Sequence, residues 1–171
     1  MSSVAIFYGS TGGNTKEAAE MICKELGGEG NVDIFDVGNL KDASDFGKYQ
    51  KLILGTSTWG DGDLQDDWYD FMKHFEKVDL SGKSVALFGL GDQDGFGHAY
   101  LNGLKVLYDA VKKQGAKIVG AWKAEGYTYD ESEAVIDGKF VGLALDADNQ
   151  DDLTAERVKE WCKMIKSELA L

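Results

Sequence analysis

The stretch from Tyr8 to Lys16 constrains the fold of this chain more than any other, because it joins an apolar run to an amphipathic one. Residues 4–7 are all apolar and predict a buried parallel strand, and residues 17–26 carry apolar side chains at helical spacing. A strand-to-helix turn rich in glycine and hydroxyl groups directs backbone N–H groups and a helix N-terminus at one point, which suits a phosphate. The alternative is a plain hydroxyl-rich helix cap, since Ser, Thr and Asn favour that position.

Two common phosphate-binding motifs do not match this turn. A Walker loop has Gly-Lys-Ser/Thr after a fixed spacing, and a dinucleotide fingerprint has Gly-x-Gly-x-x-Gly, whereas the turn has Gly9, Gly12 and Gly13. The turn contains no Arg, and its only Lys is Lys16, inside the predicted helix. A phosphate monoester would therefore be held mainly by neutral donors, including the side chains of Ser10, Thr11 and Thr15.

Strands and helices alternate along the rest of the chain. Further strands are predicted at 32–35, 51–55, 84–90 and 117–122, and further helices at 64–75, 101–113 and 154–169. A polar stretch, 123–138, precedes another strand-like run at 139–145, and no helix fits between them, so an insertion splits strand five. The pattern predicts an α/β domain spanning residues 1–171, with a parallel sheet and helices on both faces.

Three glycine-rich loops follow predicted strands, at 9–15, 56–63 and 91–100. Ligands of open parallel sheets bind beyond the carboxyl ends of the strands. Trp59 lies in the second loop and Phe96 in the third, and two flat apolar faces can sandwich a planar ring. A ring and one phosphate make a mononucleotide. Alternatively, each aromatic side chain is partly buried under its own loop.

The chain resembles the long-chain flavodoxins over essentially its whole length. The resemblance rests on the turn 9–15, the loop 58–64 followed by Asp67-Trp68, the segment 89–93, and the split fifth strand with the segment 138–150. It implies a flavodoxin-like three-layer sandwich whose five-stranded parallel sheet has the order 2-1-3-4-5. It also implies one non-covalent FMN, used to shuttle single electrons at low potential between redox enzymes.

By motif position, the resemblance implies a phosphate turn, two ring-flanking aromatic side chains, backbone contacts at the ring edge and a ribityl contact. The expected cofactor-binding residues are Ser10, Thr11, Gly12, Gly13, Asn14, Thr15, Thr58, Trp59, Gly60, Asp61, Leu90, Gly91, Asp92, Phe96, Tyr100 and Asp148. The family usually has Thr or Ser in place of Gly12 and Tyr in place of Phe96, and Tyr100 is a less favoured substitute for the second. No catalytic residue or metal ligand is expected.

The formal net charge of −12 argues against nucleic acid and anionic membranes as partners. It suits basic redox proteins: a flavodoxin reductase or oxidoreductase as donor and low-potential enzymes as acceptors. The alternative is that the charge serves solubility alone.

Cys23 and Cys162 are expected to be free thiols, and no signal peptide or membrane span is evident. A cytoplasmic monomer is the expectation.

Acidic side chains dominate the ring loops, where Asp61, Asp63, Asp92 and Asp94 would oppose the negative charge of a reduced flavin. His98 could tune the ring or be a bystander.

The main alternative function is an FMN-dependent quinone reductase of related fold, which needs an open cavity above the ring. A phosphoacceptor module needs acidic residues after strand one, where this chain has Tyr8-Gly9-Ser10. A non-redox binding module is a further alternative. We expect an electron-transfer protein, not an enzyme.

Overall fold

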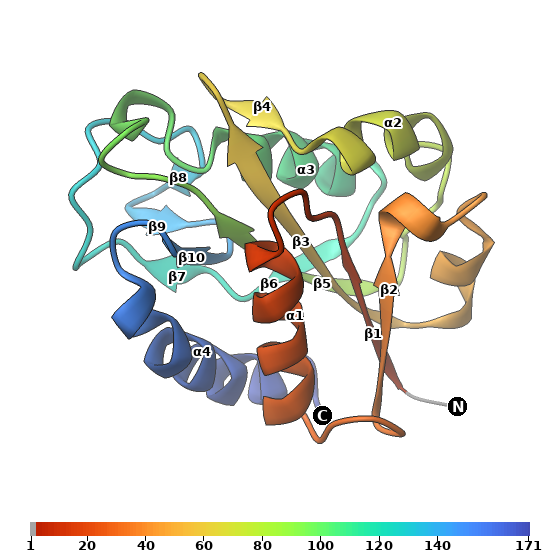
Figure 1. Cartoon of the computed structure of the whole chain (residues 1–171). Helices are drawn as coiled ribbons and strands as arrows, with labels where there is room; N and C mark the ends of the chain where they lie inside the picture. The colour runs from red at the N-terminus through yellow and green to blue at the C-terminus, as the bar shows by residue number, and fades with distance from the viewer. Residues whose placement is uncertain (1–2) are drawn as a thin grey trace.

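The computed structural model describes residues 3–171 and is built on one twisted parallel sheet (Figure 1). Its strand order is β10-β5-β3-β1-β2, with β6 also paired to β5. The bounds are β1 Val4–Tyr8, β2 Val32–Asp36, β3 Lys51–Trp59, β5 Ser84–Leu90, β6 Lys117–Val119 and β10 Leu143–Leu145. Counted along the main sheet with β10 in fifth place, this is the predicted 2-1-3-4-5 order.

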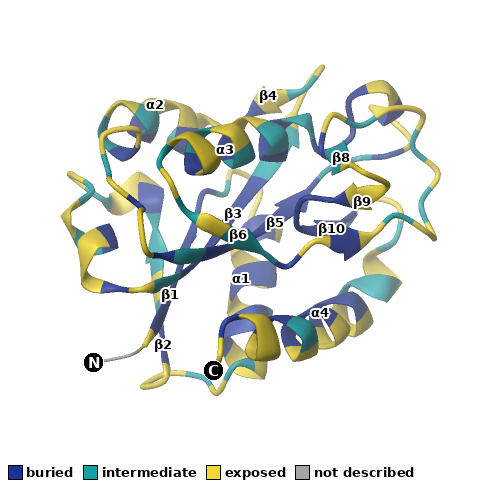
Figure 2. Ribbon diagram, turned by 180° about the vertical axis from the view of Figure 1, so that it is seen from behind, coloured by how far each residue is buried: buried dark blue, intermediate teal, exposed yellow. Residues whose placement is uncertain are grey.

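Helices cover both faces of the sheet, which confirms the predicted three-layer sandwich. Figure 1 shows α1 (Asn14–Glu25) and α4 (Thr154–Glu168) side by side on one face, with α2 (Asp66–Phe75) and α3 (Asn102–Lys113) on the other. Short 3-10 helices occur at Val37–Asn39, Ser44–Lys48, Gly97–Ala99 and Asp151–Leu153. The central strands are buried and the helices expose only their outer sides (Figure 2). This pattern follows from strands that are apolar on both faces and from amphipathic helices.

The predicted insertion in strand five is present. β6 pairs with Ser84–Ala86 of β5, and β10 pairs with the later part, Phe88–Leu90. Between them, β7 (Trp122–Lys123), β8 (Val135–Ile136) and β9 (Lys139–Phe140) form a small antiparallel sheet of order β7-β9-β8. The chain returns to the main sheet through Gly142, where a Cβ atom would lie 2.1 Å from the Leu87 carbonyl oxygen. Only glycine allows that approach.

An aromatic cluster fixes the insertion to the body of the molecule. Phe140 packs among Tyr100, Tyr127 and Tyr129, with ring centroids 5.0–5.8 Å from its own. The guanidinium of Arg157, on α4, lies 4.2 Å from the Tyr127 ring and donates a hydrogen bond to the Gly126 carbonyl. Cation–π contact and buried aromatic area therefore hold a segment whose own sheet is too small to be stable alone.

Several element boundaries differ from the sequence-based predictions. The run predicted as one strand at 117–122 is divided, because β6 ends at Val119 and Trp122 belongs to β7 in the small sheet. β3 continues past residue 55 to Trp59, because Thr56 and Ser57 pair with β5 and because β4 (Asp63–Leu64) folds back and pairs with Thr58 and Trp59. The run predicted as one strand at 139–145 is divided between β9 and β10, which belong to different sheets. α1 begins at Asn14, three residues before the periodic apolar pattern, because the pattern does not register a polar first turn.

Candidate functional site

The three glycine-rich loops meet at the carboxyl ends of β1, β3 and β5, and with the segment after β10 they enclose a cavity of about 280 Å³. Because all four strands are parallel, their carboxyl ends share one edge of the sheet. The lining consists of hydroxyl, aromatic, backbone and carboxylate groups: Ser10, Thr11, Gly12, Asn14, Thr15, Ser57, Thr58, Trp59, Leu90, Gly91, Asp92, Phe96, Ala147 and Asp148.

One end of the cavity is rich in hydrogen-bond donors that the protein itself leaves uncommitted. α1 begins after Gly13, whose φ of 96° is left-handed, and no side chain caps the helix. Thr15 is only 1% exposed, yet its hydroxyl makes no hydrogen bond within residues 3–171. Ser10 Oγ accepts the Gly13 N–H at 3.1 Å, so its own hydrogen is free to donate. These donors line the cavity without partners in the protein, and an anion at the helix N-terminus would accept hydrogen bonds from them.

The other part of the cavity has two aromatic rings that remain half exposed. Trp59 is 47% exposed and Phe96 is 42% exposed. The indole N–H of Trp59 donates to Ser57 Oγ at 2.8 Å, and the Phe96 amide donates to the Asp92 carbonyl at 2.9 Å, so both residues are tied to the cavity wall. Neither ring fills the protein core. A planar ligand that covered both rings would bury their apolar surface.

Two carboxylates in the lining have pKa values shifted in opposite directions. The Gly95 backbone N–H and the Asn149 amide lower the pKa of Asp92 by hydrogen bonding to its Oδ1 atom. Partial burial raises the pKa of Asp148, and repulsion from Asp92 and Asp146 adds to that effect. Asp92 therefore keeps a negative charge at the cavity wall at neutral pH.

Asp146 lies behind this wall and joins the two loops that form it. It is fully buried, and its carboxylate accepts hydrogen bonds from the backbone N–H groups of Gln93, Asp148 and Asn149, each at 3.1 Å. The Asn149 side-chain amide adds a fourth at 2.9 Å. The loop after β5 and the loop after β10 are thus fixed by one buried side chain.

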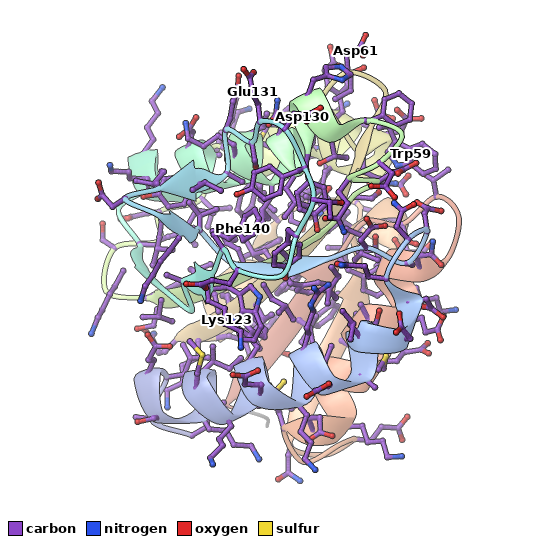
Figure 3. The ribbon with its side chains drawn as sticks, turned by 90° about the vertical axis from the view of Figure 1, so that its left-hand side faces the viewer. Trp59, Asp61, Lys123, Asp130, Glu131 and Phe140 are labelled. Atoms are coloured by element: carbon purple, nitrogen blue, oxygen red, sulfur yellow. The ribbon has the colours of Figure 1, made fainter. Side chains whose placement is uncertain are left out.

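The structure brings most of the predicted site residues together in this cavity, and four lie outside its lining. Gly13 supplies the N-cap of α1. Gly60 and Asp61 continue the loop beyond Trp59, and Asp61 contacts His98 Nε2 at 2.9 Å. Tyr100 lies in the core, where its hydroxyl donates to the Leu145 carbonyl at 3.0 Å, so the structure does not bring it to the cavity. Figure 3 shows Trp59 at the side of the molecule and Asp61 at the tip above it.

Two lining residues, Ser57 and Ala147, were not predicted. Ser57 lies between Thr56 and Thr58, and the hydroxyl-rich end of a parallel strand is a usable signal for it. Ala147 carries no chemical signal, and only its position beside Asp148 brings it to the wall.

Fold and cavity together define a class: a doubly wound α/β protein whose switch point is shaped for a ring and one phosphate. The flavodoxin family model matches residues 6–161. The chain therefore belongs to the flavodoxin family.

Individual relatives are similar along the whole chain. A flavodoxin of Synechocystis sp. is 46% identical over 97% of both chains, and flavodoxin 1 of Azotobacter vinelandii is 44% identical over 98% of both. Among solved structures, Fusobacterium nucleatum flavodoxin bound to flavin mononucleotide superimposes with a TM-score of 0.91 at 36% identity, covering 98% of this chain and 99% of that one. No helix within residues 3–171 is long and apolar enough to cross a membrane.

Proposed function

We propose that this chain binds one FMN non-covalently in the cavity and carries single electrons between redox proteins. The observation that carries the proposal is the division of the cavity into an end with uncommitted donors, Thr15 and the α1 N-terminus, and a part flanked by the half-exposed rings of Trp59 and Phe96. Membership of the flavodoxin family and the FMN bound in the similar Fusobacterium structure support it.

Bound FMN would supply a ring that accepts and releases electrons one at a time. The chain positions that ring and sets its surroundings. The hydroxyls of Ser10, Thr11 and Thr15, with the first N–H groups of α1, would hold the phosphate without a cation in the cavity lining. Trp59 and Phe96 would flank the ring and limit its contact with water. The negative charge of Asp92 would disfavour further negative charge on a bound flavin, which would lower the reduction potential of the flavin.

Conversion of a substrate is not favoured. A quinone reductase needs open space over the ring, and here Trp59 and Phe96 line that space from two different loops. The curated relatives are named flavodoxins, which are electron-transfer proteins.

We further propose that the partners are basic redox proteins, with a flavodoxin reductase or oxidoreductase as donor and low-potential enzymes as acceptors. Asp130 and Glu131 of the insertion, whose backbone N–H groups both donate to the Gly97 carbonyl, bring negative charge beside the loop that carries His98. Figure 3 shows these two residues and Asp61 along the same upper edge. A monomer that presents this edge suits electrostatic steering. We also propose a cytoplasmic location, in keeping with the two free buried cysteines.

Purified protein loaded with FMN tests the function. Stepwise chemical reduction followed by visible spectroscopy should show two separate one-electron stages, and NADH alone should give no sustained turnover. Riboflavin is the matched ligand control, because it lacks only the phosphate. A colourless protein that takes up no added FMN, or steady NADH oxidation without a reductase, would contradict the proposal.

A further inference from the structure

Gln65 makes three hydrogen bonds, two within the first turn of α2 and one to the phosphate turn. It is 1% exposed, and as the N-cap of α2 its Oε1 accepts the Trp68 backbone N–H at 3.2 Å. Its Nε2 donates to Asp67 Oδ2 at 2.8 Å and to Thr11 Oγ1 at 3.2 Å. The contact with Thr11 spans 54 residues of sequence, so it joins the first loop of the site to the second helix.

The two partners within α2 determine which way round the Gln65 amide lies. A backbone N–H can only donate, so the amide oxygen must face Trp68. An ionised carboxylate can only accept, so the amide nitrogen must face Asp67. Both constraints give the same orientation, and the second amide hydrogen then points to Thr11 Oγ1. Gln65 has no alternative rotamer of its amide that satisfies all three partners.

This arrangement decides what the Thr11 hydroxyl can do. A hydroxyl that accepts from Gln65 keeps its own hydrogen available, and within residues 3–171 it donates to no other group. Thr11 lines the cavity beside Ser10, whose oxygen is used in the same way by the Gly13 N–H. The Ser10 and Thr11 hydroxyls are therefore both left as donors, the role that an anion requires.

We propose that Gln65, oriented by Asp67, is a positioning residue for the phosphate subsite, and that it acts by making Thr11 a donor toward the phosphate. The proposal deepens the FMN-binding function and rests on it. It assigns a binding role to Thr11 that depends on a residue outside the cavity lining.

The test measures dissociation constants of FMN and riboflavin, by quenching of flavin fluorescence, and uses their ratio as the readout. Hydrogen bonds to charged groups contribute roughly 1.5–3 kcal/mol, which is about a tenfold to hundredfold change in affinity. Thr11→Val should therefore lower the preference for FMN about tenfold or more, with the riboflavin affinity changing much less than the FMN affinity. Thr11→Ser, the conservative control, should retain the preference.

Gln65→Met keeps the side-chain volume and removes the amide. It should lower the FMN preference several-fold in the parent but have no further effect on the ratio in Thr11→Val, because the residue acts through that hydroxyl. Asp67→Ala provides a second variant that spares the α2 cap, and it should shift the ratio in the same direction. It keeps the idea testable if Gln65→Met folds poorly.

A rescue variant is available at Gly12, where an added Cβ would meet nothing within 4 Å and the backbone φ is not positive. Gly12→Thr in the Thr11→Val background should restore part of the FMN preference, whereas Gly12→Val should not. An unchanged ratio in Thr11→Val, or an equal loss from Gln65→Met with and without the Thr11 hydroxyl, would overturn the proposal. A parent that binds neither flavin would instead overturn the FMN function itself.

Discussion

Removing the Asp146 carboxylate should destabilise the protein strongly, because four donors depend on it. Each carboxylate oxygen takes two of them: Oδ1 accepts from the Asp148 and Asn149 backbones, and Oδ2 from the Gln93 backbone and the Asn149 side chain. At roughly 1.5–3 kcal/mol for each bond to a charged group, a simple sum would be about 6–12 kcal/mol. Water entry and loop relaxation reduce it, and losses above about 4–5 kcal/mol from one substitution are exceptional.

We therefore expect Asp146→Ala to lose about 4 kcal/mol of unfolding free energy, a large part of the about 5–15 kcal/mol available to a domain. Asp146→Asn keeps one oxygen and hence two of the four donors, so it should lose about half as much. FMN affinity should fall in both variants, because the loops after β5 and β10 line the cavity.

Urea unfolding of the apoprotein, followed by circular dichroism, measures the stability change, and fluorescence titration with FMN measures the affinity. Asp152→Asn, at an exposed neighbouring position, removes the same charge without those hydrogen bonds and serves as the control. A loss below about 1 kcal/mol in Asp146→Ala, within the range of ordinary surface substitutions, would refute the reasoning.

Three further predictions concern the loops of the site. Gly60 has a φ of +52°, so Gly60→Val should lose about 1–2 kcal/mol of unfolding free energy, while Gly60→Asn should be better tolerated; equal urea midpoints would contradict this. The folded chain holds the Asp148 proton more tightly than the unfolded chain, because its pKa is raised, so ionisation costs stability as pH rises above the ordinary carboxyl range. Asp148→Asn should thus be more stable than the parent at neutral pH, by less than about 1 kcal/mol for this exposed group, with the gain vanishing near pH 3; a gain that is independent of pH would rule out this cause. Reversing Asp63 and Asp66 to Lys should slow electron transfer from a basic reductase, most at low salt, and a rate insensitive to ionic strength would count against steering.

Most of the fold could be predicted from local patterns. Apolar runs followed by helical periodicity gave the strands and helices of the main sheet, and the missing helix between residues 123 and 138 indicated the split fifth strand. The boundaries that differed, at Trp59, within 117–122 and within 139–145, depend on pairing with β4, with β5 and within the small sheet. Strand pairing between distant segments leaves no local signal.

The sequence predicted most residues of the candidate site, but it did not predict the direction of every side chain. The hydroxyls of the first loop and the aromatic residues Trp59 and Phe96 could be named, because glycine-rich loops after parallel strands must share one edge of the sheet. Tyr100 lies close to Phe96 in sequence, yet its ring turns into the core to pack on Tyr129 and Phe140. Sequence proximity does not specify side-chain direction at the end of a loop.

The sequence by itself determined the class of fold, the position of the ligand edge and the negative charge, because these follow from composition, periodicity and the geometry of parallel strands. Only the tertiary structure decided how the loops are held. Gln65 reaches Thr11 across 54 residues, and Asp146 reaches Gln93 across 53. Such contacts depend on where the packed layers bring distant backbones together, and a buried polar group finds its partners only after that packing has excluded water.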